Sequence, residues 1–118
     1  MEFYTFNKDA GTKITKYDSD FIFSRIVRTQ TGASIGCMHL GEGGVIGYHQ
    51  AVSPQLLLII KGEGYVRSES NIYVKVQEGD AVFWQKDEWH ETKSDIGLMA
   101  IVIESESLNP STFMIEKS

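Results

Sequence analysis

The stretch GGVIGYHQAVSPQLLLIIKGEGYVRSESNIYVKVQEGDAVFWQKDEWHETKS, from Gly43 to Ser94, decides the fold of this 118-residue chain. It contains short segments rich in β-branched and aromatic residues, such as QLLLII and DAVFW, which are typical of β-strands. These segments are separated by KGEG, SESN and QEGD, whose small and polar residues are typical of turns. The central stretch therefore predicts short strands joined by tight turns.

The same pattern continues on both sides of this stretch. The expected strands are Phe21–Thr29, Ala33–Leu40, Gln55–Ile60, Gly64–Ser68, Ile72–Val76, Asp80–Trp84 and Leu98–Glu104. No segment keeps an apolar period of 3.6 residues long enough for a confident helix, and the N-terminal stretch and residues 108–115 allow at most a turn or two. Many short, closely spaced strands indicate a sandwich or a barrel. We expect a single domain over residues 1–118, with a core at about 33–104.

Alternation of side chains indicates which strands are covered on both faces. In IYVKV, Ile72, Val74 and Val76 share one face, as in a half-buried strand. QLLLII is apolar on both faces, so both faces must be covered. A barrel interior on one side, and a second barrel or a terminal segment on the other, meets that requirement. This motivates the hypothesis of a homodimer.

Composition excludes several classes of partner. The chain is 42% hydrophobic and 23% charged, with a net charge of −5 and no cluster of Lys or Arg, which argues against nucleic acid and anionic membranes. The longest apolar run, Leu56–Ile60, is far too short to span a bilayer. The N-terminal residues lack the pattern of a signal peptide. The one cysteine, Cys37, cannot form a disulfide within the chain. We expect a cytoplasmic protein in which Cys37 is a buried, unreactive thiol.

Glycines and histidines recur in the central stretch at fixed intervals. The first block reads G-x5-H-x-A-x3-Q-x6-G and consists of Gly43, His49, Ala51, Gln55 and Gly62. The second reads G-x5-Q-x-D-x2-H-x3-S and consists of Gly79, Gln85, Asp87, His90 and Ser94. In spacing, the two blocks resemble the two motifs of the cupin family, G-x5-H-x-H-x3,4-E-x6-G and G-x5-P-x-G-x2-H-x3-N. The resemblance implies an all-β, double-stranded β-helix (jelly-roll) barrel.

The resemblance also implies a metal site, with departures from the usual ligands. Metal-binding cupins use both histidines and the glutamate of the first motif and the histidine of the second. Here these positions are His49, Ala51, Gln55 and His90. The candidate ligands are therefore His49, Gln55 and His90, a set that accepts Zn²⁺, Mn²⁺, Fe²⁺, Ni²⁺ or Cu²⁺. The amide is uncharged, so a bound ion would keep its full charge and would attract an anion. In the alternative, the same three side chains are hydrogen-bonding residues of a polar lumen that holds no metal.

Other polar and aromatic residues carry weaker expectations. His39 is expected at the surface or rim, although an inward orientation would restore a three-imidazole site. Trp84 is expected in the core, and Trp89 either packs at the rim or forms a stacking wall at the pocket mouth. Tyr48 and Glu91 neighbour the two histidines in sequence and are expected to point away from the lumen. Glu104 and Glu106 are expected on a solvated face.

These residues support three hypotheses of function. The first is a metal-dependent enzyme, such as an isomerase, lyase or dioxygenase, in which the ion acts as a Lewis acid on a small molecule. The second is a non-catalytic module that binds or senses a sugar or an organic acid without metal. The third is a barrel that serves only as a scaffold. The fold itself does not choose among them.

Overall fold

The computed structural model describes residues 1–117, and most of its regular structure is β-strand. The strands are β1 (Glu2–Thr5), β2 (Thr12–Ile14), β3 (Phe21–Phe23), β4 (Ser34–Leu40), β5 (Val45–Gln50), β6 (Gln55–Arg67), β7 (Val74–Gln77), β8 (Asp80–Trp84), β9 (Trp89–Lys93), β10 (Leu98–Glu104) and β11 (Ile115–Glu116). Three single-turn 3-10 helices cover Lys8–Ala10, Lys16–Asp18 and Pro110–Thr112. Residues 1–117 contain no α-helix. The all-β prediction is confirmed.

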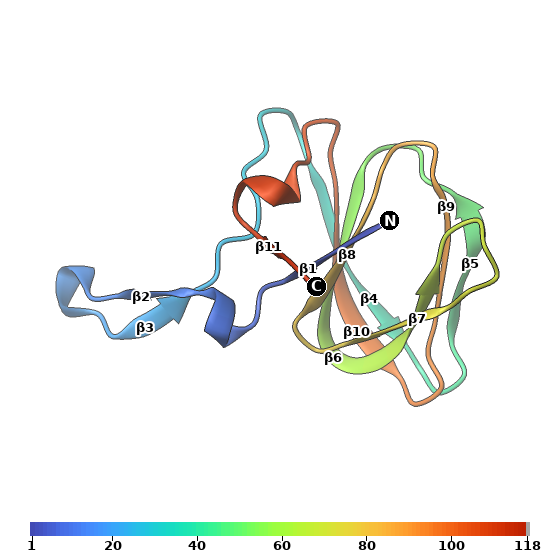
Figure 1. Cartoon of the computed structure of the whole chain (residues 1–118), viewed down its shortest axis with the longest axis horizontal. Helices are drawn as coiled ribbons and strands as arrows, with labels where there is room; N and C mark the ends of the chain where they lie inside the picture. Colours follow the sequence, from blue (N-terminus) through green and yellow to red (C-terminus); the bar gives the residue numbers. More distant parts are fainter. Residues whose placement is uncertain (118) are drawn as a thin grey trace.

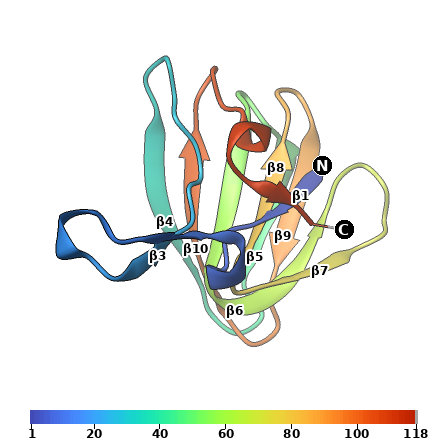
Figure 2. The same ribbon diagram turned by 60° about the vertical axis from the view of Figure 1, so that its left-hand side comes forward.

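Nine of the strands form one antiparallel sheet that folds over on itself at β6 (Figures 1 and 2). The first half of β6 lies between β8 and β10, in the order β11-β1-β8-β6-β10-β4. The second half of β6 lies between β7 and β9, and β9 pairs with β5. The two halves of the sheet enclose an apolar interior. Its buried side chains include Leu57, Ile59, Val66, Val76, Val82, Trp84, Ala100 and Val102.

The long strand β6 corrects the prediction of two strands separated by a KGEG turn. Gly62 has φ +83°, and the pairing with β10 shifts register between Met99 and Ala100. A glycine in this conformation bends a strand without ending it, as in a β-bulge. The turn-like composition therefore marks a bend at which one strand passes from one half of the barrel to the other.

The outer face of β6 is covered by segments from both ends of the described chain. Leu56 and Leu58 are buried, and they belong to a second apolar cluster with Tyr4, Leu108 and Met114. Of the two covers that the sequence allowed, the terminal segment is the one observed. The apolar character of QLLLII on both faces is therefore explained within one chain.

Several predicted boundaries are wrong for identifiable reasons. Of the expected strand Phe21–Thr29, only Phe21–Phe23 pairs, and it pairs with β2 away from the barrel. In IYVKV, Val76 is buried and Val74 half-buried, but Ile72 lies before the strand and is 73% exposed. Strands β1, β2, β5, β9 and β11 were not predicted.

Cys37 is exposed, contrary to expectation. It pairs with Ile101 across β4 and β10, and Ile101 packs against the outer cluster. Alternation therefore places the thiol on the outer face of β4, because adjacent partners in a ladder point to the same side. Within residues 1–117, no helix is long and apolar enough to cross a membrane.

Candidate functional site

His49 and His90 meet on neighbouring strands of the smaller half of the barrel. They are direct partners in the β5–β9 ladder, and their ring centroids lie 4.4 Å apart at 51°. The ladder shifts register between Ile46 and His49, where β5 carries one extra residue. Such a bulge re-aims the side chains that follow it. The structure therefore brings together the two histidines that the sequence singled out.

His90 is buried against the interior of the barrel, whereas His49 is exposed. The His90 side chain is 2% exposed, and its ring lies 4.4 Å from that of the fully buried Trp84. His49 is exposed. The pair thus has one buried ring and one solvent-accessible ring.

The surroundings of the two rings indicate which of their nitrogens could bind a ligand. His49 Nδ1 lies 2.6 Å from the carbonyl oxygen of Gly47. A carbonyl oxygen only accepts, so Nδ1 is the donor, and in the neutral ring Nε2 presents a lone pair. His90 Nε2 is buried and has no hydrogen-bond partner within residues 1–117. A buried polar atom without a partner calls for a ligand, a water or an ion.

Burial lowers the pKa of His90 to about 4, with a further contribution from the charge that His49 can carry. Glu88 acts in the opposite direction but more weakly. The imidazole is therefore neutral at physiological pH. A neutral imidazole is the form that binds a metal ion or accepts a hydrogen bond.

We expect the metal-free protein to lose stability as the pH falls from about 6.5 to about 4. In the unfolded chain, His90 takes up a proton near its ordinary pKa of about 6.5. In the folded protein, it does so only near pH 4. Within this window the unfolded state binds more protons, so acid favours unfolding, and the contribution of His90 is complete above the window. The full shift corresponds to at most about 3 kcal/mol. Urea unfolding of EDTA-treated protein across this pH range measures it. The His90→Gln variant should show a flatter profile, and equal slopes for the two proteins would contradict the assignment.

Gln55, the third predicted ligand, lies on the same inner face but contacts a different group. It is 7% exposed, and it is the ladder partner of both Trp84 and Glu104. Its Nε2 donates to Glu104 Oε1 at 2.7 Å. This bond turns the amide oxygen away from Glu104. Trp84 adjoins both groups, as the ladder partner of Gln55 and the ring neighbour of His90.

Glu104 is a site residue that the sequence reasoning missed. It was expected on a solvated face, but it is half-buried and shares the inner face of β10 with Ala100 and Val102. The period-2 alternation of LMAIVIE contained this signal, since Glu104 follows Leu98, Ala100 and Val102 in register. Glu106, in contrast, is exposed as expected.

The remaining candidates lie outside the lumen. His39 is exposed and pairs with Met99 on the outer side of β4, so it does not restore a third imidazole. Trp89 stacks on Tyr48 at a centroid distance of 5.3 Å, on the outer face of β5 and β9. Glu91 is ion-paired with Arg67 on this same face. The expected outward orientations of Tyr48 and Glu91 are confirmed, and Trp89 does not wall the site.

The donor set fits a metal ion in part. Imidazole nitrogens bind such ions at about 2.0–2.1 Å, and two rings with centroids 4.4 Å apart are close enough to share one. A backbone carbonyl that holds Nδ1 is the usual support of a ligating histidine. However, no group of three or more His, Cys, Asp or Glu side chains in the described part of the chain is arranged to hold an ion. A metal here would need Gln55 or an exogenous ligand beside the two imidazoles.

Solved structures share this architecture. No family model and no curated protein matches the sequence. A conserved protein with a double-stranded β-helix domain from Klebsiella pneumoniae gives a TM-score of 0.60 at 14% identity, over 81% of this chain and 84% of that chain. A cupin superfamily protein from Desulfitobacterium hafniense gives 0.58 at 12% identity, over 68% and 72%. A predicted oxalate decarboxylase from Thermotoga maritima gives 0.54 at 22% identity, over 58% and 62%. The molecule described here is therefore a small protein with the cupin fold.

Proposed function

We propose that this protein binds one divalent transition metal ion at His49 and His90 and, through that ion, a small organic anion. The observation that supports the proposal most is the pair of adjacent imidazoles. One is held through Nδ1, and the other has a buried Nε2 with no hydrogen-bond partner among residues 1–117. Gln55 completes the set in this proposal, through the amide oxygen that its bond to Glu104 leaves free. Zn²⁺, Mn²⁺, Fe²⁺, Ni²⁺ and Cu²⁺ all accept imidazole ligands.

The charge of the ligand set favours an anionic partner. Two neutral imidazoles and an amide leave the charge of a divalent ion uncompensated by its direct ligands. A small carboxylate supplies the missing charge and fills open coordination positions, as in sites that bind ligands rather than stabilise folds. One structure of the same fold is a predicted oxalate decarboxylase, so oxalate is a suitable probe.

When bound, the ion supplies Lewis-acid chemistry to the oxygen atoms of the ligand. The chain itself holds Gln55 through Glu104, and the fully buried Trp84 packs beside His90. Glu104 is a carboxylate on the inner face, beside a proposed ligand. A proton-transferring group in this position would make the site catalytic, which is the enzyme form of the proposal.

Calorimetric titration of EDTA-stripped protein, first with Zn²⁺ and then with oxalate, tests the proposal. We expect one zinc ion per chain and oxalate binding only to the zinc-loaded form. Metal analysis of protein purified without chelator provides an independent check. Absence of zinc uptake would contradict the metal proposal, and oxalate binding of equal strength without zinc would contradict the role of the ion.

A second candidate function is binding of a polar organic molecule, such as a sugar or an organic acid, without metal. Its specific support is that Trp84 Nε1 and His90 Nε2 are both buried and, as far as residues 1–117 extend, both lack hydrogen-bond partners. The two rings are neighbours, so one polar ligand could meet both atoms. Thermal-shift screening against sugars and organic acids distinguishes the two candidates. Stabilisation that persists in EDTA favours this one.

A further inference from the structure

Strand β5, which carries His49, is held in the sheet from one side only. It pairs with β9, and its other edge carries no strand among residues 1–117. The ladder also shifts register between Ile46 and His49, where two residues of β5, Gly47 and Tyr48, oppose one residue of β9. Such a bulge leaves a residue outside the ladder and disrupts the pairing locally. The ladder before His49 is therefore a weak constraint on the position of its ring.

The bulge sets the orientation of the His49 ring. His49 Nδ1 lies 2.6 Å from the carbonyl oxygen of Gly47, which is one of the two bulge residues. A carbonyl that holds one ring nitrogen orients the other nitrogen toward a metal ion. Tyr48 lies between Gly47 and His49 in the chain, so a shift of Tyr48 moves both the carbonyl and the ring. The orientation of His49 thus depends on how Tyr48 is held.

Tyr48 is held on the outer face of the sheet by side chains from two other strands. Its ring stacks on that of Trp89, on β9, with centroids 5.3 Å apart and planes at 24°. The guanidinium carbon of Arg67, on β6, lies 4.2 Å from the centroid of the Tyr48 ring. Offset ring stacking and cation–π contacts are both attractive. They tie the edge strand β5 to two strands that lie further inside the sheet.

Arg67 is fixed in its turn by a carboxylate. Its Nε donates to Glu91 Oε1 at 2.9 Å, and the two side chains are only 14% and 16% exposed. Arg67 and Glu91 are also ladder partners on β6 and β9. The hydroxyl of Tyr73 donates to the same carboxylate oxygen. The cation that lies against Tyr48 is therefore held in one place. We call Tyr48, Trp89, Arg67 and Glu91 the clamp.

We propose that the clamp positions the imidazole of His49 against that of His90: it holds the bulge of β5 from the outer face, and the bulge aims the ring on the inner face. Tyr48 is then a positioning residue, which acts through the backbone and does not touch an ion or a ligand. The effect of the clamp on metal binding rests on the proposed function. The positioning of the two rings does not, since it applies equally to the metal-free protein.

The order of residues along the two strands explains how one face acts on the other. Tyr48 precedes His49, and Trp89 precedes His90. Consecutive residues of a strand point to opposite faces. The Tyr48–Trp89 stack thus lies behind the histidine pair, whose ring centroids are 4.4 Å apart. A change in the separation of the outer rings is passed to the inner rings through the backbones of β5 and β9.

The positioning is tested first in EDTA-treated protein, by nuclear Overhauser effects between the imidazole protons of His49 and His90. We expect these effects in the wild type and in Tyr48→Phe, which keeps the stacked ring, and we expect their loss in Tyr48→Ala. Amide hydrogen exchange should become faster in β5 of Tyr48→Ala and should stay unchanged in β8, because only the edge strand is released. Histidine contacts that persist in Tyr48→Ala would overturn the proposal.

Zinc titration gives a second readout. Tyr48→Ala should weaken Zn²⁺ binding by about 10–100-fold, which is the usual effect of losing a residue that supports a metal ligand. Tyr48→Phe should bind zinc as the wild type does. If the wild type binds no zinc, the metal proposal fails, and the histidine contacts in metal-free protein still decide on the clamp. If the wild type and Tyr48→Ala bind zinc equally, the clamp proposal fails and the metal proposal stands.

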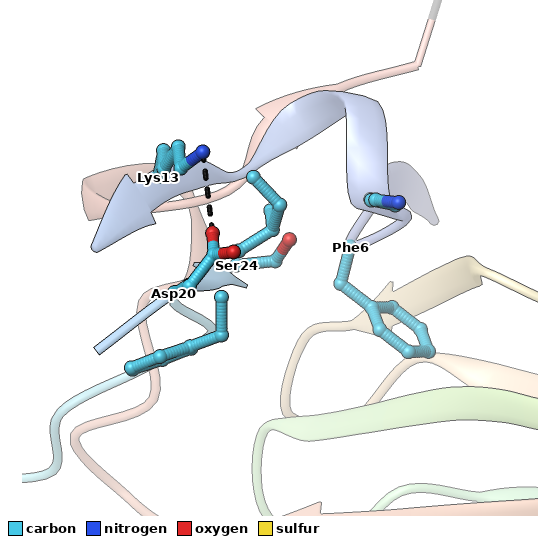
Figure 3. Close-up of a pocket in the computed structure, with 7 residues that line it drawn as sticks. Phe6, Lys13, Asp20 and Ser24 are labelled. Atoms are coloured by element: carbon cyan, nitrogen blue, oxygen red, sulfur yellow. Dashed lines mark ion pairs between the residues drawn. The ribbon is translucent and has the colours of Figure 1, made fainter. Parts of the chain in front are cut away.

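The hairpin of β2 and β3 provides a matched control, because it projects from the barrel on the side away from β5 and β9 (Figure 1). Phe21 is 49% exposed there, against 41% for Tyr48, and its ring lies 6.4 Å from that of Phe23. Lys13 and Asp20 form an ion pair at 3.2 Å on the same hairpin (Figure 3). Phe21→Ala removes a similarly exposed aromatic ring and should change neither the histidine contacts nor the zinc affinity. Effects equal to those of Tyr48→Ala would overturn the proposal.

A second variant tests the clamp from its other side. Arg67→Lys keeps the positive charge but removes the planar guanidinium that lies against the Tyr48 ring. We expect weaker histidine contacts and a lower zinc affinity than in the wild type. Circular dichroism checks that each variant folds, and if Tyr48→Ala does not, Arg67→Lys decides by the same two readouts. Wild-type values in folded Arg67→Lys would then contradict the clamp.

Discussion

Replacing His90 by alanine is expected to weaken Zn²⁺ binding by more than about 100-fold. Loss of a residue that only supports a metal ligand lowers metal affinity by about 10–100-fold. This change removes a proposed ligand itself, so its effect should be larger. His90 contributes a buried Nε2 that has no hydrogen-bond partner among residues 1–117. Without it, the ion retains one imidazole and an amide. Zinc titration of the EDTA-stripped variant measures the loss.

The other two histidines provide matched comparisons. His49→Ala should cause a loss of similar size, since its ring lies 4.4 Å from that of His90. His39→Ala should leave the affinity unchanged, because His39 is exposed on the outer side of β4. If His39→Ala weakened zinc binding as much as His90→Ala, the measured zinc would be bound at the surface and not in the barrel.

Replacing Gly62 by alanine is expected to destabilise the fold by about 2–5 kcal/mol, as the sum of a left-handed backbone penalty of about 1–2 kcal/mol and overpacking of about 1–3 kcal/mol. Gly62 has φ +83°, and a Cβ atom there would lie 2.2 Å from the carbonyl oxygen of Gly97. That atom belongs to the backbone of the adjoining strand segment and cannot move as a side chain would. Urea unfolding at neutral pH measures the change.

Two other glycines separate the causes. Gly43 also has a positive φ, +71°, but a Cβ atom added there would meet nothing within 4 Å, so Gly43→Ala should show the backbone penalty alone, about 1–2 kcal/mol. Gly32 has open space and no such backbone conformation, and its replacement by alanine should change little. Equal effects at Gly43 and Gly62 would show that the bend in β6 tolerates a side chain.

The apolar strands and the histidine pair could be predicted from the sequence because their signals are local. DAVFW and LMAIVIE became β8 and β10 with the predicted bounds. The resemblance of the two glycine–histidine blocks to the cupin motifs predicted that His49 and His90, although distant in the chain, lie together, and they are ladder partners. These features depend on composition and intervals, which the sequence displays directly.

The errors arise where tertiary context decides. β5 and β9 contain YHQ and WHETK, whose polar side chains give little apolar alternation, and a bulge interrupts the pairing at His49. Alternation shows that Cys37 and its neighbours point to opposite sides of β4, but not which side faces the interior. The placement of Glu104 beside Gln55 likewise depends on the register between β6 and β10, a long-range property.

A crystal structure of the zinc-supplemented protein, with anomalous diffraction at the zinc edge, tests the central claim most directly. That claim is that the imidazoles of His49 and His90 share one site on the β5–β9 ladder. We expect a single anomalous peak within bonding distance of both rings. A peak beside His39 or elsewhere on the surface, or two rings turned to opposite sides of the β5–β9 ladder, would contradict it.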